Sequence, residues 1–449
     1  MTPELLAKYA RPVPRYTSYP TAPHFGPAVG RGTYRGWLEA LGDKGPLSLY
    51  LHIPFCRSLC WFCGCTTRVA NGPGPVERYL ALLLHEIEMV AGAIGGRPEV
   101  GHVHLGGGTP TCLGADGLRR LGEALAERFD FGRLREFAVE IDPRVLTAEE
   151  AEALGAIGAT RASLGVQDFA PEVQRSVNRV QSFETTARAA EALRRHGVAS
   201  LNIDLLYGLP HQSAESVVDT VEQSLTLAPD RLALFGYAHV PWMKRHQRLI
   251  PEAALPGAEE RWRQASAAAA TLRERGYIAI GIDHFAREGD EMAGALAEGA
   301  LKRNFQGYTT DRSASLVGLG ASAIGCLPQG YAQNAADLAV YAEAIECREL
   351  ATARGIAIDD DDRLRRDIIE ALMCRFEAPV EEMRQAYGRA PGYFADAYRK
   401  LAPMAEDGLV EISLGRVSVS EAGRPLVRAL CAAFDRYFTS GEGRHSIAV

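Results

Sequence analysis

Short apolar runs alternate with helical patterns over residues 47–275 of the chain. Apolar runs bounded by turn residues predict buried strands, and apolar residues three and four positions apart predict helices between them. Strands that alternate with helices form a parallel sheet, and a full barrel needs eight such units. The pattern therefore predicts an α/β fold with a partial, open (β/α)6 barrel. The six predicted strands span residues 47–53, 101–105, 137–141, 161–166, 201–207 and 232–237, and residues 277–282 are a candidate for a further strand.

The predicted barrel is flanked by an arm and by a second domain. We expect an N-terminal arm over residues 1–44, the barrel with its extension over residues 45–330, and a mostly helical C-terminal domain over residues 331–449. Within this last domain, helical patterns precede a predicted hairpin at residues 407–420, which resembles a small winged-helix unit. Such units often bind DNA, but the chain carries a net charge of −7, so we favour a packing or substrate-covering role.

The arm contains the sequence RYTSYPTAPHF at residues 15–25, which is aromatic, interrupted by proline and without helical period. Two interpretations are open for this segment. It packs as an arm on the surface of the main domain, or it forms a lid over an active site. The first interpretation is the simpler one and is favoured here.

Composition places the chain among globular proteins. It has 449 residues, of which 47% are hydrophobic and 23% are charged, the usual balance for such domains. We find no signal peptide and no apolar run long enough to span a membrane. Five of the nine cysteines are scattered along the chain. This distribution is not that of a disulfide framework, and it indicates a reducing compartment. We therefore expect a cytoplasmic monomer that binds neither membrane nor nucleic acid.

The loop after the first predicted strand holds the other four cysteines, which are Cys56, Cys60, Cys63 and Cys65. Thiolates are soft ligands, and so dense a group of them can surround one compact metal centre. Structural zinc usually takes two ligand pairs that lie far apart in the sequence. A cubane iron–sulfur cluster, in contrast, suits a single short loop. We therefore favour an iron–sulfur cluster over zinc and over a disulfide.

Glycine and polar residues collect where the predicted strands end. In parallel barrels the reactive groups lie at the carboxyl ends of the strands. Glycines let the backbone approach a small ligand closely, although a glycine triplet can also simply form a turn. Besides the cysteine loop, these strand-end positions are Gly106, Gly107, Gly108, Glu140, Gln167, Asp204 and Ala238.

Two carboxylates among these positions allow two interpretations each. Asp204 lies in an apolar run, so its charge needs a partner, and Arg179 is one candidate. The pair is either a structural salt bridge or part of a cofactor site. Glu140 is either a solvated strand end or a group that binds ribose hydroxyls or an ammonium.

The spacing C-x3-C-x2-C, with Phe62 before the third cysteine, resembles the cluster loop of the radical S-adenosylmethionine enzymes. The resemblance extends through an ordered series of motifs from about residue 11 to residue 330. These stretches are similar to the oxygen-independent coproporphyrinogen III dehydrogenases, also called oxidases, a family of that superfamily. They are RYTSYPTAPHF, LSLYLHIPFC, HLGGGTPT, EIDPR, LGVQDF, NIDLLYGLP, YAHVP, RNFQGYTT and GLGASAI.

The resemblance implies a reaction and its cofactors. Members of this family convert two propionate side chains of coproporphyrinogen III into vinyl groups by oxidative decarboxylation, which gives protoporphyrinogen IX in haem biosynthesis. A 5′-deoxyadenosyl radical removes the hydrogen, and it arises from S-adenosylmethionine at a [4Fe–4S] cluster. The family binds two molecules of S-adenosylmethionine. An electron donor for the cluster and an electron acceptor are implied partners.

The resemblance also assigns residues to the cofactors. Cys56, Cys60 and Cys63 would be the cluster ligands, which leaves Cys65 as a bystander thiol or a substrate-side group. The contacts implied for the cluster-bound S-adenosylmethionine are Tyr50, Phe62, Gly106, Glu140 and Ile324. The contacts implied for the second molecule are Gly107, Gly108, Thr109, Gln167, Arg179, Asp204 and Ala238.

Two related functions stay open at this stage. Relatives of the same fold include a haem chaperone and haem-degrading methyltransferases. The chaperones lack the RYTSYPTA arm and the fourth cysteine, so both features favour the dehydrogenase. A porphyrinogen with four propionates also needs basic partners. Our candidates are Arg303 with Lys302, and Lys244 with Arg245.

Overall fold

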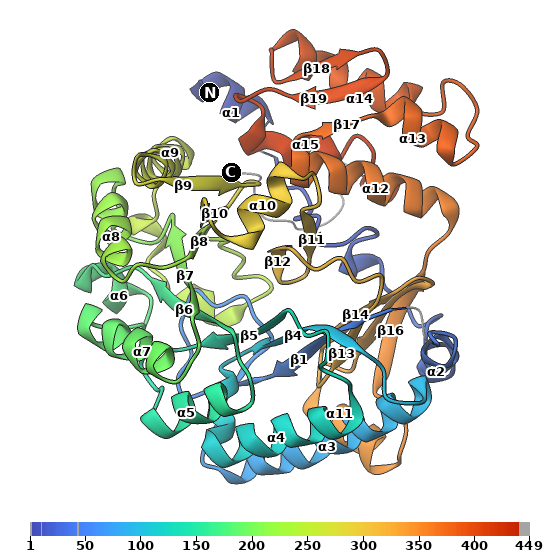
Figure 1. Cartoon of the computed structure of the whole chain (residues 1–449). Helices are drawn as coiled ribbons and strands as arrows, with labels where there is room; N and C mark the ends of the chain where they lie inside the picture. The colour runs from blue at the N-terminus through green and yellow to red at the C-terminus, as the bar shows by residue number, and fades with distance from the viewer. Residues whose placement is uncertain (1, 10, 43–44, 440–449) are drawn as a thin grey trace.

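A sheet of twelve strands curves into an open barrel, and helices cover its outer face (Figure 1). The structure is a computed structural model that describes residues 2–9, 11–42 and 45–439. The strand order is β16-β15-β14-β13-β1-β4-β5-β6-β7-β8-β10-β9. The strands from β13 to β8 are mutually parallel, and the strands beyond them on both edges are antiparallel.

All six predicted barrel strands form, so the predicted α/β fold with a partial (β/α)6 barrel is confirmed. The strands are β1 (Leu47–Ile53), β4 (Val100–Gly107), β5 (Glu136–Ile141), β6 (Arg161–Gln167), β7 (Ser200–Tyr207) and β8 (Arg231–Gly236). The connecting helices are α3 (Gly74–Ile94), α4 (Gly114–Arg128), α5 (Ala148–Ala156), α6 (Pro171–Ser176), α7 (Phe183–Arg195), α8 (Ala214–Thr226) and α9 (Ala258–Glu274). The candidate further strand becomes β9 (Tyr277–Ile280), which pairs with β10 (His284–Arg287) at one edge.

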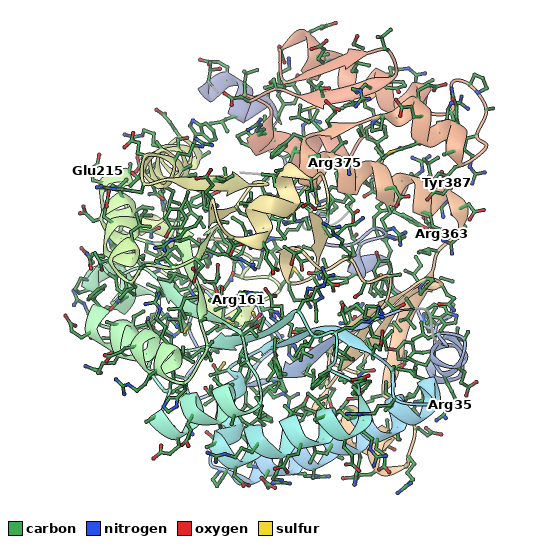
Figure 2. All side chains as sticks on the ribbon, in the orientation of Figure 1. Arg35, Arg161, Glu215, Arg363, Arg375 and Tyr387 are labelled. Carbon is green, nitrogen blue, oxygen red and sulfur yellow. The ribbon has the colours of Figure 1, made fainter. Side chains whose placement is uncertain are left out.

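Side chains on the barrel strands alternate between an apolar outer face and a polar inner face. On the outer face, Leu49, Leu51 and Ile53 of β1 pack into the main hydrophobic core. Figure 2 shows Arg161 inside the curve of the sheet, whereas Glu215 lies on the outer helix α8. Buried polar groups are costly unless they are paired or meet a ligand. The interior cavity has a volume of about 150 Å³, and its polar lining includes Ser48, His102, His104, Glu140, Ser163, Asn202 and Asp204.

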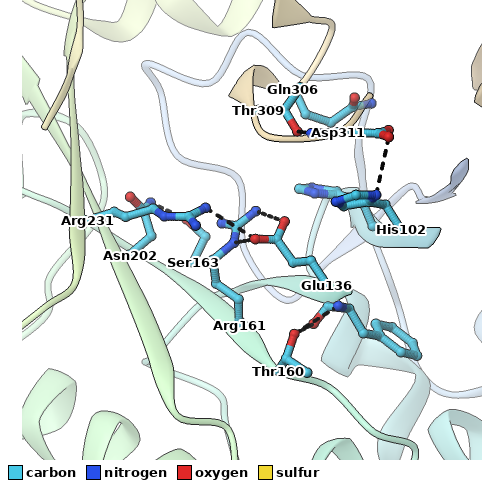
Figure 3. A network of polar contacts seen from close by, with 12 residues as sticks. His102, Glu136, Thr160, Arg161, Ser163, Asn202, Arg231, Gln306, Thr309 and Asp311 are labelled. Carbon is cyan, nitrogen blue, oxygen red and sulfur yellow. Dashed lines mark hydrogen bonds and ion pairs between the residues drawn. The ribbon is translucent and has the colours of Figure 1, made fainter. Parts of the chain in front are cut away.

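A network of ion pairs closes the amino-terminal end of the barrel (Figure 3). Glu136 accepts hydrogen bonds from Arg161 Nε and Nη2, both at 2.9 Å, and from Arg231 Nη1 at 3.2 Å. Arg231 also lies 2.8 Å from Asp290. Burial raises the pKa of Glu136, but the two arginines outweigh that effect and hold it well below its usual value. Paired charges therefore line the cavity at this end of the barrel.

The sheet continues beyond the barrel strands through residues that we expected to open the C-terminal domain. Strands β15 and β16 remain in the large sheet, and α11 packs against α3. A boundary at residue 330 would cut this extension, so we propose that the C-terminal domain begins near residue 358. The extension comprises β13 (Leu316–Leu319), β14 (Ile324–Leu327), β15 (Gly330–Asn334), α11 (Leu338–Glu346) and β16 (Thr352–Ala357).

The buried carboxylate of Glu86 ties this extension to the barrel. It accepts hydrogen bonds from Gly320 N at 2.6 Å, Asn334 Nδ2 at 2.6 Å and Tyr341 OH at 2.7 Å. Burial raises the pKa of Glu86 to about 7, although the three donors partly offset this. One side chain on α3 thus fixes the turn after β13, the strand β15 and the helix α11.

The C-terminal domain is mostly helical and carries a small sheet, as predicted. Its three strands have the order β17-β19-β18, and the predicted hairpin is formed by β18 and β19. Its elements are α12 (Asp360–Arg375), β17 (Glu377–Ala378), α13 (Val380–Ala386), α14 (Ala395–Glu406), β18 (Val410–Ser413), β19 (Arg416–Val419) and α15 (Val427–Cys431). Between barrel and domain lie α10 (Glu291–Ala297) and the hairpin of β11 (Lys302–Asn304) and β12 (Gly307–Thr309).

The N-terminal arm packs on two parts of the molecule. Its first half lies on the C-terminal domain, and its second half lies on the main domain, where we expected the whole arm. Helix α1 (Pro3–Tyr9) lies beside this domain in Figure 1. Tyr16 and Tyr19 are buried in the core of the domain. Tyr16 OH donates to Asp435 Oδ2 at 3.0 Å, and Arg436 N donates to Tyr19 OH at 3.0 Å. The arm then reaches the sheet at Gly26, which pairs with Gly355 of β16, and α2 (Arg31–Glu39) packs on α3.

We expect Tyr19→Ala to lower the free energy of unfolding by about 3–5 kcal/mol, because a fully buried aromatic side chain is lost from a packed core. Tyr16→Phe, which removes only a buried hydroxyl, should cost about 1–3 kcal/mol. Thermal unfolding of both variants checks this. A Tyr19→Ala protein with the parental melting temperature would show that the arm is no part of this core.

Candidate active site

The cysteine loop leaves the carboxyl end of β1 and is closed at its base by a short pair of strands. β2 (Phe55–Cys56) pairs in parallel with β3 (Arg68–Val69), and Ala70 N donates to Cys56 O at 3.0 Å. Farther along the loop, Trp61 N donates to Val177 O at 2.9 Å. The loop is therefore held at its base and at its middle, and its thiols lie at the open end of the barrel.

Cys60 is buried and faces two arginines. Arg179 Nη1 and Arg144 Nη2 each lie 3.4 Å from Cys60 Sγ. Asp142 aligns both, since it lies 2.7 Å from Arg144 Nη2 and 3.3 Å from Arg179 Nη2. Charged donors stabilise a thiolate and the sulfur of a metal cluster. This arrangement suits a cysteine that must be deprotonated to bind iron.

The other two predicted ligands also receive donors. Cys56 Sγ lies 3.1 Å from Thr67 Oγ1 and 3.6 Å from Thr109 Oγ1. Cys65 N donates to Cys63 Sγ at 3.4 Å. The side chain of Cys65, and to a smaller extent its backbone N–H, lower the pKa of Cys63 to about 7, whereas burial raises the pKa of Cys56.

The donor set fits an iron–sulfur cluster better than a single ion. Within residues 2–9, 11–42 and 45–439, no three His, Cys, Asp or Glu side chains converge tightly enough to hold one metal ion. A cubane does not require such convergence, because each thiolate binds a different iron atom. Three thiols with nearby hydrogen-bond donors, on one loop, are what such a cluster needs.

The glycine run after β4 packs directly against the start of the cysteine loop. A Cβ on Gly108 would lie 2.4 Å from Phe55 O. Gly107 has a φ of +108°, and a Cβ there would lie 2.6 Å from the His52 ring. Gly108 N also donates to Ile53 O at 2.8 Å. Only glycine permits this close approach, so the run sets the position of the loop.

Glu140 ends β5 on the inner face and is held ready to accept hydrogen bonds. Its carboxylate accepts from Gly107 N at 3.0 Å and from His104 Nε2 at 3.1 Å. Burial raises the pKa of Glu140, but these hydrogen bonds outweigh it and keep the pKa below its usual value. A Cβ on Gly106 would lie 2.9 Å from this carboxylate. An ionised acceptor therefore adjoins the glycine run at the barrel mouth.

Asp204 lies in the same interior but does not pair with Arg179, so the predicted partner is wrong. It accepts hydrogen bonds from Ser163 Oγ and Asn202 Nδ2, both at 2.8 Å. Burial raises its pKa. Arg179 contacts Cys60 and Asp142 instead. No ion pair to Asp204 occurs in the described part of the chain, which weakens the structural salt-bridge interpretation.

The remaining predicted contacts lie around the same end of the barrel. Tyr50 OH lies 2.9 Å from His52 Nδ1. Gln167 ends β6 with a φ of +73°, and Ala238 O accepts a hydrogen bond from Gln247 at 3.2 Å. Ile324 begins β14, on the opposite side of β1 from the glycine run.

The sequence analysis named Ala238, Lys244 and Arg245 in the loop after β8 but did not predict that this loop contacts the backbone carbonyls of the cysteine loop. Three side chains of this loop make the contacts, and no local motif marks them. Their distances are 2.8 Å from Lys244 Nζ to Cys65 O, 2.8 Å from His246 Nε2 to Cys63 O, and 3.0 Å from Gln247 Nε2 to Phe62 O. His52 and His104 were also missed, although both stand at inward positions of predicted strands.

Two family models match the chain. The model of the radical SAM superfamily matches residues 50–223, and the model of the HemN C-terminal domain matches residues 358–426. The barrel and its cysteine loop therefore define a radical SAM domain. A relative from Bradyrhizobium diazoefficiens, named oxygen-independent coproporphyrinogen III oxidase, is 50% identical over 97% of both chains. This chain belongs to the family of oxygen-independent coproporphyrinogen III oxidases.

A solved structure agrees with this assignment over the whole fold. The coproporphyrinogen III oxidase HemN from Escherichia coli, described as a radical SAM enzyme, superposes with a TM-score of 0.90 at 42% identity. The match covers 94% of this chain and 98% of that one. In the described part of the chain, no helix is both long and apolar enough to cross a membrane.

We expect Gly108→Ala to displace the cysteine loop, because its Cβ would overlap Phe55 O. Gly64→Ala is the matched control, since a Cβ on Gly64 meets nothing within 4 Å. Anaerobic reconstitution followed by iron analysis and visible absorbance checks both. Gly108→Ala should lose most of its iron, and Gly64→Ala should keep it. Full iron content in Gly108→Ala would show that the loop position does not depend on this contact.

Proposed function

We propose that the chain catalyses the oxidative decarboxylation of two propionate side chains of coproporphyrinogen III to vinyl groups, giving protoporphyrinogen IX in haem biosynthesis. The observation that carries this proposal is the cysteine loop, with its donors, at the open end of a radical SAM barrel. Relatives named for this reaction match nearly the full chain. The alternatives, a haem chaperone and a haem-degrading methyltransferase, are not favoured by these relatives.

Cys56, Cys60 and Cys63 are the proposed ligands of a [4Fe–4S] cluster. When bound, the cluster with S-adenosylmethionine supplies a 5′-deoxyadenosyl radical that abstracts hydrogen from an unactivated carbon. The protein holds the thiolates through Arg144, Arg179 and the backbone of Cys65. The barrel wall and the loop after β8 enclose the same site and limit the access of water, which protects a reactive radical.

Glu140 is the central residue of the proposed site for the cluster-bound S-adenosylmethionine. Its carboxylate is ionised and lies beside Gly106, so it can accept hydrogen bonds from ribose hydroxyls or from an ammonium group. Tyr50, Phe62 and Ile324 complete this proposed site. Tyr50 is positioned by its hydrogen bond with His52.

A second molecule of S-adenosylmethionine is proposed next to the first. Asp204 supports this, because its carboxylate lines the cavity and its two hydrogen-bond donors are a hydroxyl and an amide group without charge. A sulfonium or an ammonium would supply the missing positive charge. The other proposed contacts are Gly107, Gly108, Thr109, Gln167, Arg179 and Ala238.

We further propose a cytoplasmic monomer that takes electrons from a separate donor and passes the electrons of the decarboxylation to an acceptor. The scattered cysteines support a reducing compartment, since the nine cysteines are all free. Radical formation at the cluster consumes one electron, so a donor is required by the chemistry itself.

We expect Cys56→Ala, Cys60→Ala and Cys63→Ala each to lose the cluster absorbance and all cleavage of S-adenosylmethionine, because three thiolates hold the cluster. Cys65→Ala should retain the cluster. The assay is anaerobic turnover of coproporphyrinogen III by the reconstituted protein, read for vinyl-bearing product. If Cys65→Ala loses iron as completely as the other three, the ligand assignment fails. A wild-type protein that binds haem tightly and forms no vinyl product would favour the chaperone.

Asp204→Asn should abolish turnover while leaving the melting temperature nearly unchanged, because the substitution removes charge without a cavity. Asp290→Asn is the control for stability. It breaks a buried ion pair with Arg231 and should cost about 3–5 kcal/mol. Turnover and thermal unfolding are measured for both. A large stability loss in Asp204→Asn with unchanged binding of S-adenosylmethionine would return Asp204 to a structural role.

A further inference from the structure

Two arginines from distant parts of the chain act on each other beside the cysteine loop. Arg15 belongs to the arm, and Arg303 belongs to the β11–β12 hairpin between the barrel and the C-terminal domain. The charges that act on Arg15 include those of Asp283, Arg303 and Cys65. The two guanidinium groups therefore share one electrostatic environment, and the cysteine loop borders it.

Arg303 is the best-defined member of this group. Its side chain is only 6% exposed, and its guanidinium lies 4.4 Å from the centre of the Tyr308 ring. Its Nη2 is 3.8 Å from Asp283 Oδ2, which is too far for a hydrogen bond. Its Nε and Nη1 are buried and have no hydrogen-bond partner. A buried guanidinium with unpaired donors is costly to leave unsatisfied, and so it marks a position where an anion is missing.

The local charges agree with this conclusion. Asp283 acts on both Arg15 and Arg303, and it is already bound to His284 Nδ1 at 2.7 Å. The positive charges of Arg15 and Arg303 also act on each other. A further carboxylate beside Arg303 would offset this repulsion.

The neighbouring basic residues do not share this property. Lys302, which we expected to act with Arg303, is exposed and pairs with Glu370 at 2.5 Å. Lys244 donates to the backbone of the cysteine loop. Both amines have a hydrogen-bond partner, so among Arg303, Lys302 and Lys244 only Arg303 combines burial with unpaired donors.

We propose that Arg303, together with Arg15, forms a carboxylate-binding subsite that receives propionate groups of the porphyrinogen substrate. The proposal rests on the proposed function, which supplies a substrate with several propionates. A planar guanidinium binds a carboxylate through two parallel hydrogen bonds, and the unpaired Nε and Nη1 of Arg303 are available for them. The subsite is assembled from the arm and from the β11–β12 hairpin, so substrate binding would connect these two segments.

The test compares the free acid of coproporphyrin III, a stable probe, with its tetramethyl ester. Arg303→Gln should weaken binding of the acid about 10- to 100-fold, the loss expected for charge-assisted hydrogen bonds, and should leave binding of the ester unchanged. Lys302→Gln is the matched control and should bind both probes as the wild type does. An equal loss for acid and ester would overturn the proposal, as would a parental affinity of Arg303→Gln for the acid.

Measuring turnover of coproporphyrinogen III distinguishes a failure of the proposed subsite from a failure of the proposed function. Arg303→Gln should raise the KM for coproporphyrinogen III much more than it lowers kcat, with unchanged iron content. If the variant does not fold, Arg15→Gln, whose side chain is exposed, replaces it and should show the same preferential loss for the acid. Wild-type protein that makes no vinyl product refutes the proposed function. Wild-type turnover combined with a parental KM in both arginine variants refutes only the subsite.

Discussion

The contact between the glycine run after β4 and the base of the cysteine loop is the constraint on which the site depends. Gly108 lies so close to Phe55 that no side chain fits between them. Gly107 lies similarly close to the His52 ring, so a side chain there would clash as well. The parallel pairing of β1 with β4 brings these segments together, with Ile53 opposite Gly107. Because β5 then continues the register, Glu140 reaches the same place. Sheet geometry thus places the acceptor beside the thiols before any ligand binds.

The barrel could be predicted from sequence because each of its strands is a local pattern. A run such as residues 201–207 identifies itself through its own apolar residues and its bounding turns. The strands β13 to β16 could not be recognised in this way. They are short and rich in glycine, and Glu86 on the distant helix α3 stabilises their arrangement. Pairing partners that lie far apart in sequence leave no periodic signal, so the predicted end of the main domain fell inside the sheet.

The same distinction separates the predicted site residues from the missed ones. The cysteines and glycines form dense motifs, and the structure brings them together at one end of the barrel. The partner of Asp204 was wrong because the direction of the Arg179 side chain depends on the turn after α6, which places it against Cys60. Gln247 and His246 were missed because they act by holding backbone carbonyls of the cysteine loop. A contact between a side chain and a distant backbone carbonyl produces no pattern in the sequence.

The arrangement of the arm gives it a role that neither of the two initial interpretations contained. Tyr16 and Tyr19 anchor it in the C-terminal domain through buried rings and two hydrogen bonds. Arg15 immediately precedes this anchor and lies in the electrostatic environment of Arg303 and the cysteine loop. An anchored arm can hold one exposed cation at a fixed place near the barrel mouth, which a mobile lid could not. The burial of Tyr16 and Tyr19 therefore packs the arm on the C-terminal domain and also fixes Arg15 for its proposed contact with the substrate.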